Sequence, residues 1–213
     1  MTEMETQIQL LRVVPVLAVE SAESAIPLAD ALIAGGLPVA EITFRTAAAA
    51  EVIRTLSRER PQLLVGAGTV TTPEQAKAAK ECGATFALAP GFNPRVVRAA
   101  QEVGLPFIPG VMTPTEIESA LELGLRTLKF FPAGAAGGVK MLSSLYAPYA
   151  HLGVRFVPTG GISPENLVEW LNQKSVLAVG GSWLAKKTDI AEGRWEEIAQ
   201  KCREAVALAK GVS

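Results

Sequence analysis

The chain has 213 residues, of which 20 are basic and 21 acidic, so its formal net charge at pH 7 is −1. This balance argues against a nucleic-acid-binding protein, which normally carries a basic excess or a basic stripe. The single histidine, His151, excludes a histidine-rich metal centre within one chain. It also argues against a serine–histidine–aspartate triad, which needs a positioned histidine with an orienting partner.

The N-terminal segment, MTEMETQIQLLRVVPV, carries acidic residues and lacks a long apolar core. We therefore expect neither a signal peptide nor a transit peptide, but a helix around residues 3–11. No part of the chain reaches the roughly 18 consecutive apolar residues of a membrane helix, so we expect no membrane partner. Cys82 and Cys202 are expected to be free thiols in a reducing cytoplasm.

Eight short apolar runs follow this first helix in chain order. Each is too short for a helix and nearly continuous in apolar residues, as buried parallel strands are. They occupy residues 13–19, 39–44, 63–67, 84–89, 106–109, 126–131, 154–158 and 176–180.

Amphipathic helices are predicted between these runs. A side chain suited to capping precedes a proline suited to the first helical position at Thr72-Pro73, Asn93-Pro94, Thr113-Pro114 and Ser163-Pro164. Three helices are expected to end in a left-handed glycine, at Gly83, Gly104 and Gly124. Residues 185–210 are expected to form one amphipathic terminal helix with a charged, solvated side.

This alternation of strands and helices predicts an α/β fold: a (β/α)8 TIM barrel with an N-terminal helix, in a single domain that spans residues 1–213. The competing architecture is an open doubly wound sheet. Such a sheet usually carries a GxGxxG motif after its first strand, and the six residues after the first run, ESAESA, contain no glycine.

Two charged side chains share the interior side of the second predicted strand. Side chains alternate along a strand, so Glu41 and Arg45 lie on one side of VAEITFRT while Ala40 and Ile42 face the helices. At about 3.3 Å per residue, the two charges are roughly 13 Å apart along the strand. Arg45 stands at the C-terminal end, where barrel active sites lie, and Glu41 lies deeper.

Lys129 is predicted to point into the barrel, because it alternates with Leu128 and Phe130 in RTLKFFPAG. Burial disfavours the charged form of an amine, and the neutral amine is the form that attacks a ketone. The alternative is a structural ion pair with Glu41, although such buried pairs stabilise a fold poorly relative to apolar side chains. We favour a functional lysine, with Lys140 as the only serious rival nucleophile.

Paired glycines follow the last two predicted strands. The sequences PTGGIS and GGSWL contain Gly160-Gly161 and Gly180-Gly181, whose backbone amides can approach an anion closely. The loops after strands seven and eight commonly bind phosphate in barrel enzymes. Thr69, in GAGTV after the third strand, adds a small donor at the same end. The three tryptophans are expected to pack in the core or in an interface: Trp170, Trp183 and Trp195.

Five motifs, in their order and spacing, resemble the 2-keto-3-deoxy-6-phosphogluconate (KDPG) aldolases, a family that also includes 4-hydroxy-2-oxoglutarate (KHG) aldolase activity. They are VAEITFRT, VGAGTV, LKFFPA, FVPTGGIS and GGSWL. The resemblance extends from about Val13 to the final helix. It implies a cytoplasmic, homotrimeric class I aldolase that needs neither a metal nor a cofactor and releases pyruvate from a phosphorylated keto acid.

The same resemblance implies a role for each site residue. Lys129 would form the Schiff base, Glu41 would be the general acid and base, and Arg45 with Thr69 would hold the pyruvate carboxylate. The phosphate would be bound by Gly160, Gly161 and Ser182, with Thr159 and Gly181 alongside. Pro90 and Phe131 are also expected to contact the substrate.

The sequence departs from the family pattern at two places. Ala89-Pro90-Gly91 stands where members often read Ser-Pro-Gly, and Gly134-Ala135-Ala136 stands where many carry an acidic residue and asparagine. Two other functions stay open: a phosphosugar epimerase or isomerase on the same barrel, and a non-enzymatic phosphometabolite binder. The first would bind phosphosugars without trapping pyruvate, and the second has no use for an interior lysine that faces a carboxylate.

Overall fold

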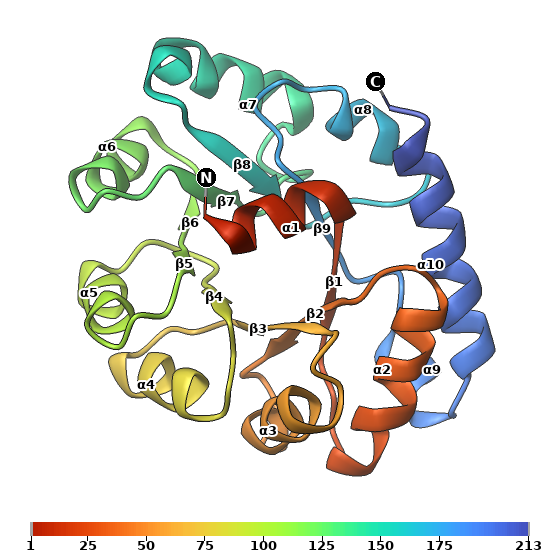
Figure 1. The fold of residues 1–213 in the computed structure, drawn as a ribbon. Coiled ribbons are helices and arrows are strands. Elements are labelled where there is room, and N and C mark those ends of the chain that lie inside the picture. The colour runs from red at the N-terminus through yellow and green to blue at the C-terminus, as the bar shows by residue number, and fades with distance from the viewer. Residues whose placement is uncertain (1, 213) are drawn as a thin grey trace.

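A computed structural model describes residues 2–212 of the chain. The strands run around a common centre, the N-terminal helix lies over that centre, and the other helices lie outside the strands (Figure 1). The N-terminal helix is confirmed as α1 (Glu3–Leu11), and it begins with a capping box in which the Thr2 hydroxyl accepts a hydrogen bond from the Glu5 amide. In the described part of the chain, no helix is long and apolar enough to cross a membrane.

All strand pairs are parallel, so the predicted α/β class with a parallel sheet is confirmed. A six-stranded sheet has the order β5-β4-β3-β2-β1-β9 and a three-stranded sheet the order β6-β7-β8. Because the last strand pairs with the first, the order differs from that of a doubly wound sheet. The strands are β1 (Val13–Leu17), β2 (Val39–Thr43), β3 (Leu64–Gly68), β4 (Phe86–Leu88), β5 (Phe107–Ile108), β6 (Gly110–Val111), β7 (Thr127–Phe130), β8 (Arg155–Pro158) and β9 (Val179–Gly181).

Each predicted apolar run contains a strand, but the fifth and eighth runs differ in detail. The fifth is split into β5 and β6 at Pro109, because proline has no backbone N–H for the ladder. The Pro109 carbonyl instead accepts a hydrogen bond of 2.8 Å from the Lys129 amide. In the eighth run the strand begins only at Val179, and Val176 forms an isolated bridge with Phe156.

The helices follow the strands as predicted, with one exception at Ser163. Side-chain caps are present at Thr72, Asn93 and Thr113. No helix begins at Pro164, because Ser163 and Asn166 close a turn and α8 starts after it. The helices are α2 (Ala25–Ala34), α3 (Ala49–Glu59), α4 (Pro73–Glu81), α5 (Pro94–Glu102), α6 (Pro114–Glu122), α7 (Gly138–Tyr146), α8 (Leu167–Leu171), α9 (Lys187–Ala191) and α10 (Trp195–Lys210), with short 3-10 helices at Ala22–Ser24 and Ala147–Leu152.

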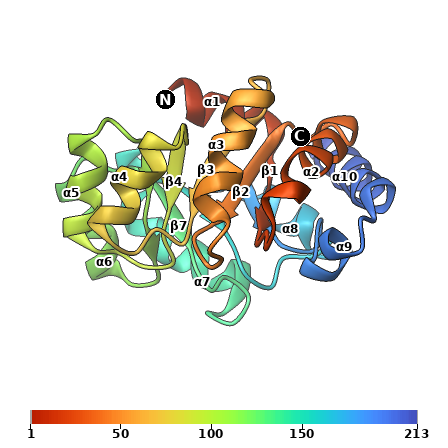
Figure 2. The same cartoon turned by 90° about the horizontal axis from the view of Figure 1, so that it is seen from below.

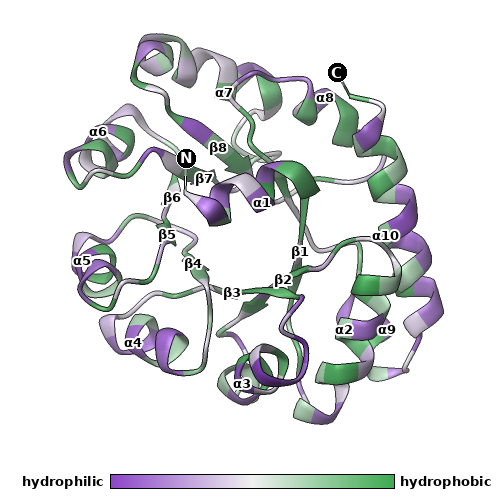
Figure 3. Cartoon of the chain, in the orientation of Figure 1, coloured by the Kyte–Doolittle hydropathy of each residue, from purple (hydrophilic) through white to green (hydrophobic). Residues whose placement is uncertain are grey.

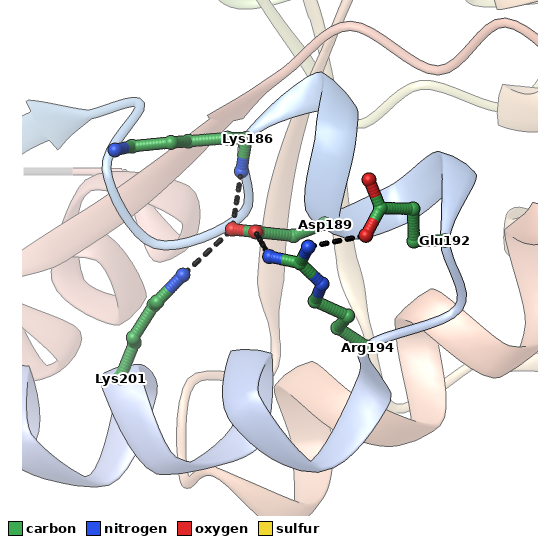
Figure 4. Close-up of polar contacts among 5 residues, drawn as sticks. All are labelled: Lys186, Asp189, Glu192, Arg194 and Lys201. Carbon is green, nitrogen blue, oxygen red and sulfur yellow. Dashed lines mark hydrogen bonds and ion pairs between the residues drawn. The ribbon is translucent and has the colours of Figure 1, made fainter.

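The prediction of one terminal helix over residues 185–210 is wrong. The chain turns between α9 and α10, where Gly193 has a φ of +67°. The buried carboxylate of Asp189 holds this corner (Figure 4). It accepts hydrogen bonds from the Lys186 amide at 3.2 Å, from Lys201 at 2.6 Å and from Arg194 at 3.4 Å.

Apolar side chains fill both sides of the strands, which are largely hydrophobic in Figure 3. The larger cluster lies between strands and helices, where Trp170, Trp183 and Trp195 pack as predicted, and both cysteines are buried and free. A smaller cluster comes from the strand side that also carries Glu41, and Ile8 of α1 joins it.

Helix α1 closes one end of the interior, where the Thr127 hydroxyl donates a hydrogen bond to the Glu5 carboxylate at 2.5 Å. Figure 2 shows α7 at the opposite end.

Candidate active site

Lys129 of β7 and Glu41 of β2 meet in the interior, although their strands belong to different sheets. The Lys129 Nζ lies 3.1 Å from Oε1 of Glu41. The two side chains are only 6% and 1% exposed. The predicted interior position of both residues is therefore correct, and the structural ion pair that the sequence left open is present. The residues and the cavity around this ion pair, rather than the pair itself, indicate a catalytic role.

A cavity of about 240 Å³ opens beside this pair at the C-terminal ends of the strands. A structural pair would be sealed by apolar side chains, whereas this one lines an open cavity whose walls include the polar residues Thr43, Arg45 and Thr69. The predicted site residues in its lining are Glu41, Arg45, Thr69, Pro90, Lys129, Phe131, Thr159, Gly160, Gly161 and Ser182. The structure thus brings together predicted site residues from six segments that are far apart in the sequence.

Gly181 is the predicted site residue that lies outside this lining. The ring of Trp183 occupies the space beside its Cα, so Gly180 lines the cavity in its place. Sequence reasoning gave no role to three lining residues, Val16, Thr43 and Ile162, and named Gly180 only as part of a glycine pair that can approach an anion. Thr43 carried a signal, because it lies on the same side of its strand as Glu41 and Arg45.

The Glu41 carboxylate is only half satisfied. Oε1 accepts the hydrogen bond from Lys129, while Oε2 is buried and has no partner among residues 2–212. The carboxylate packs directly over Gly68, where a β-carbon would lie 2.7 Å from Cγ of Glu41. Buried polar atoms are rarely left unpaired in folded proteins. The unpaired oxygen beside a cavity is therefore suited to accept a proton or a hydrogen bond from a ligand.

The surroundings of Lys129 separate it from the rival nucleophile. Its ammonium group lies 5.8 Å from the centroid of the Phe131 ring, a distance at which an aromatic face attracts a cation. Lys140, in α7, is exposed and lies outside the cavity lining. Of the two candidates, only Lys129 can reach a ligand in this cavity.

Two side chains at the mouth can bind an anion. Arg45 is exposed at the end of β2, and its Nε donates a hydrogen bond of 3.1 Å to the Thr43 hydroxyl. Thr69 has a φ of +56°, in the left-handed region that β-branched residues rarely adopt. Such strain is concentrated at functional sites. Arg45 and Thr69 thus frame the mouth with a planar cation and a hydroxyl.

Gly160 and Gly161 form the wall after β8, with φ angles of +93° and +77°. Neither amide donates a hydrogen bond within the described residues 2–212. Their carbonyls are held from outside, since the Gly160 oxygen accepts from the Gly134 amide at 2.8 Å and the Gly161 oxygen accepts from the Asn166 side chain at 2.9 Å. The loop is therefore fixed in place with free donors, as an anion site requires.

Comparisons with known proteins agree with this geometry. The 2-dehydro-3-deoxy-phosphogluconate aldolase of Haemophilus influenzae is 47% identical over 200 residues, which cover 94% of this chain and 93% of that protein. The KHG/KDPG aldolase of Escherichia coli is 46% identical over 198 residues, 93% of this chain and 92% of that protein. A solved structure of the KDPG aldolase of Legionella pneumophila, with pyruvate captured as a covalent carbinolamine intermediate, superposes with a TM-score of 0.90.

The Legionella protein is 39% identical in sequence, and the superposition covers 95% of this chain and 97% of that one. The family model described as KDPG and KHG aldolase matches residues 4–201. The match spans both strands that carry the buried lysine and carboxylate and both glycine loops. The chain belongs to the KDPG and KHG aldolase family.

Proposed function

We propose that the protein is a class I aldolase that cleaves 2-keto-3-deoxy-6-phosphogluconate to pyruvate and glyceraldehyde 3-phosphate, and that 4-hydroxy-2-oxoglutarate is a second substrate. The observation that carries this proposal is the buried Lys129–Glu41 pair, 3.1 Å apart, beside a cavity that polar and apolar residues line together. The name of the relative from Escherichia coli includes both aldolase activities, which supports the second substrate.

Lys129 is the proposed nucleophile. Transfer of its proton to Glu41 leaves a neutral amine, which attacks the C2 ketone to form a carbinolamine. Glu41 then returns the proton to the departing hydroxyl group, so that loss of water leaves a protonated imine and a free Glu41 carboxylate. When the C3–C4 bond breaks, its electron pair moves into the imine and forms an enamine, and C4 becomes the aldehyde carbon of the first product. Protonation of C3 and hydrolysis of the imine then release pyruvate and regenerate the amine.

Glu41 is the proposed general acid and base. Its unpartnered Oε2 accepts the C4 hydroxyl proton, directly or through a water molecule, as the bond breaks. The same carboxyl group returns a proton to C3 of the enamine. In this assignment Oε1 contacts the nucleophile and the unpartnered Oε2 exchanges protons with the substrate.

Arg45 and Thr69 are proposed to bind the substrate carboxylate. A guanidinium group offers two parallel N–H donors that match a planar carboxylate. Pro90 and Phe131 line the same cavity and are proposed to contact the substrate there. Holding the keto acid in a reactive geometry can supply several kcal/mol of the rate enhancement, on the order of 7 or more in favourable cases.

The phosphate group that leaves with glyceraldehyde 3-phosphate is proposed to lie against Gly160, Gly161 and Ser182, with Thr159 and Gly181 alongside. The free amides of the two glycines support this position, and the exposed Ser182 adds a hydroxyl at the cavity. Gly181 contributes through its backbone only, because Trp183 fills the space next to it.

We further infer that the eight strand positions close into one (β/α)8 barrel within a single domain. Pro109 alone separates β5 from β6, which joins the two sheets on one side. On the other side, isolated bridges pair Phe156 with Val176 and Thr159 with Gly180.

We also propose that the enzyme is a cytoplasmic homotrimer. The two free buried thiols support the cytoplasmic location, and the family resemblance supports the trimer.

The proposed function is tested by pyruvate release from both keto acids by the purified chain. We expect turnover of both, with a higher kcat/KM for the phosphorylated one, no effect of excess chelator, and loss of turnover in Lys129→Met. Lys140→Met is the matched control and should retain activity. Loss of turnover that a divalent ion restores would contradict the proposal. Binding of phosphosugars without pyruvate release would favour an epimerase or isomerase instead.

A further inference from the structure

Thr43 ends β2 inside the cavity, between the two charged residues of that strand. Its side chain is on the same side as Glu41 and Arg45, and the residue is 1% exposed. A polar side chain so deeply buried needs hydrogen-bond partners. Its hydroxyl has two: it donates to the Leu17 carbonyl at 2.8 Å and accepts from Nε of Arg45 at 3.1 Å.

The direction of both bonds follows from the chemistry of the partners. A carbonyl oxygen can only accept, so the hydroxyl proton of Thr43 points at Leu17. A guanidinium nitrogen can only donate, so the oxygen lone pair faces Arg45. The Thr43 hydroxyl therefore links the end of β1 to Nε of the Arg45 guanidinium group. Its proton must point at the Leu17 carbonyl, because the reverse arrangement would place it against the N–H of Arg45.

This link leaves the outer part of Arg45 free. Within residues 2–212, the guanidinium group makes no ion pair and no hydrogen bond other than the one from Nε to Thr43. Its two terminal nitrogens are thus available as a pair of parallel donors. The far side of the segment is fixed too, since the Thr46 hydroxyl donates to the Val19 carbonyl at 2.7 Å.

We propose that Thr43 is a positioning residue for the substrate carboxylate: its hydroxyl orients the exposed Arg45 so that both terminal nitrogens face the cavity. This inference rests on the proposed function, in which Arg45 binds that carboxylate. An arginine on the surface otherwise samples many rotamers, and fixing one of them reduces the entropy lost on binding.

The test compares Thr43→Val, which keeps the shape and removes the hydroxyl, with Thr43→Ser, which keeps the hydroxyl. Borohydride trapping at increasing pyruvate gives the half-saturating concentration, and the cleavage assay gives KM and kcat. We expect about a tenfold increase in the half-saturating concentration and in KM for the valine variant. Its kcat should change less than about threefold, and the serine variant should be near wild type. Thr43→Ala replaces the valine variant in the same comparison if that variant does not fold.

Two controls isolate the carboxylate effect from a loss of stability. Methyl pyruvate keeps the ketone but has no carboxylate, so its half-saturating concentration should be the same in wild type and Thr43→Val. Thr85 also donates its hydroxyl to a strand carbonyl, that of Val65 at 3.0 Å, but lies outside the cavity lining. Thr85→Val should lower the melting temperature without any change in KM.

A double-mutant cycle with Arg45→Gln tests whether Thr43 affects pyruvate binding through Arg45. In the glutamine background, removal of the Thr43 hydroxyl should have no further effect on pyruvate saturation. Additive effects, or unchanged saturation in Thr43→Val, would overturn the positioning role while wild type still traps pyruvate. If wild type traps no pyruvate, the proposed function itself fails, so the two failures are distinguishable.

Discussion

A β-carbon built on Gly68 would lie 2.7 Å from Cγ of Glu41 and closer still to Oε1. Contacts this short force a shift of the carboxylate, and a shift moves it away from its position 3.1 Å from Lys129. Gly68, the last residue of β3, is therefore important because it lacks a side chain: it makes room for the proposed acid and base, Glu41, beside Lys129.

We expect Gly68→Ala to lower kcat by about 100-fold, since a displacement of roughly 1 Å in a reacting group has an effect of that size. Borohydride should still trap pyruvate, because Lys129 remains in place. Gly91→Ala is the control: Gly91 has open space around its Cα and should tolerate the methyl group without loss of kcat. A Gly68→Ala variant with the kcat of wild type would show that the carboxylate position is not critical.

Much of the site could be predicted at this scale, because interior and exterior side chains alternate along each strand. Alternation placed Glu41, Arg45 and Lys129 on the interior side without any coordinates. It could not reveal that Thr43 bonds to Arg45, since this depends on side-chain rotamers. Nor could it show that Trp183 folds back over Gly181, because loop geometry has no such periodicity.

At the scale of elements, the corner between α9 and α10 depends on one buried carboxylate. The hydrogen bond from Lys201 holds the pKa of Asp189 below its ordinary value, although burial acts in the opposite direction. A lowered folded-state pKa means that Asp189 stabilises the fold at pH values above its unfolded pKa. This contribution is lost as the pH falls through the folded pKa, so the window lies below about pH 4.

We expect Asp189→Asn to lower the free energy of unfolding at pH 7 by about 1–3 kcal/mol, because two cations then lose their buried partner. The difference from wild type should shrink as the pH falls below about 4. Glu192→Gln is the matched control, since Glu192 also pairs with Arg194 but at the surface, where ion pairs contribute roughly 0–1 kcal/mol. Equal effects of the two substitutions in urea unfolding would contradict this role of Asp189.

The first helix buries one apolar side chain fully in the interior that it closes. Ile8 is 1% exposed and packs in the smaller apolar cluster, whereas Leu10 of the same helix is 79% exposed. We expect Ile8→Ala to cost about 2–5 kcal/mol in the free energy of unfolding. Leu10→Ala should change it by less than about 0.5 kcal/mol. Similar melting temperatures for the two variants would show that α1 does not close the interior.

The helices and strands could largely be predicted from their caps and apolar runs, as α4, α5 and α6 show with their threonine or asparagine caps before proline. The same signal failed at Ser163-Pro164, where Asn166 bonds to the Ser163 amide and closes a turn before the helix. It also missed the break at Gly193, because the residues on either side of the break keep a helical pattern.

At the scale of the whole molecule, the site exists only when the two sheets come together. Glu41 belongs to the six-stranded sheet and Lys129 to the three-stranded one, and the Pro109 carbonyl fixes the Lys129 backbone where the sheets adjoin. The sequence predicts the number of strand units, since each unit is a local pattern. The pairing of β9 with β1 joins opposite ends of the chain and has no local signal.

The central claim is that one buried amine, that of Lys129, condenses with a 2-oxo acid. The most direct measurement is peptide mass mapping after the protein has been incubated with pyruvate and borohydride. Protein incubated with borohydride alone is the reference. We expect one reduced pyruvate adduct per chain, on the peptide that contains Lys129, and none in Lys129→Met. An unmodified Lys129 peptide, or an adduct confined to Lys140, would contradict the account.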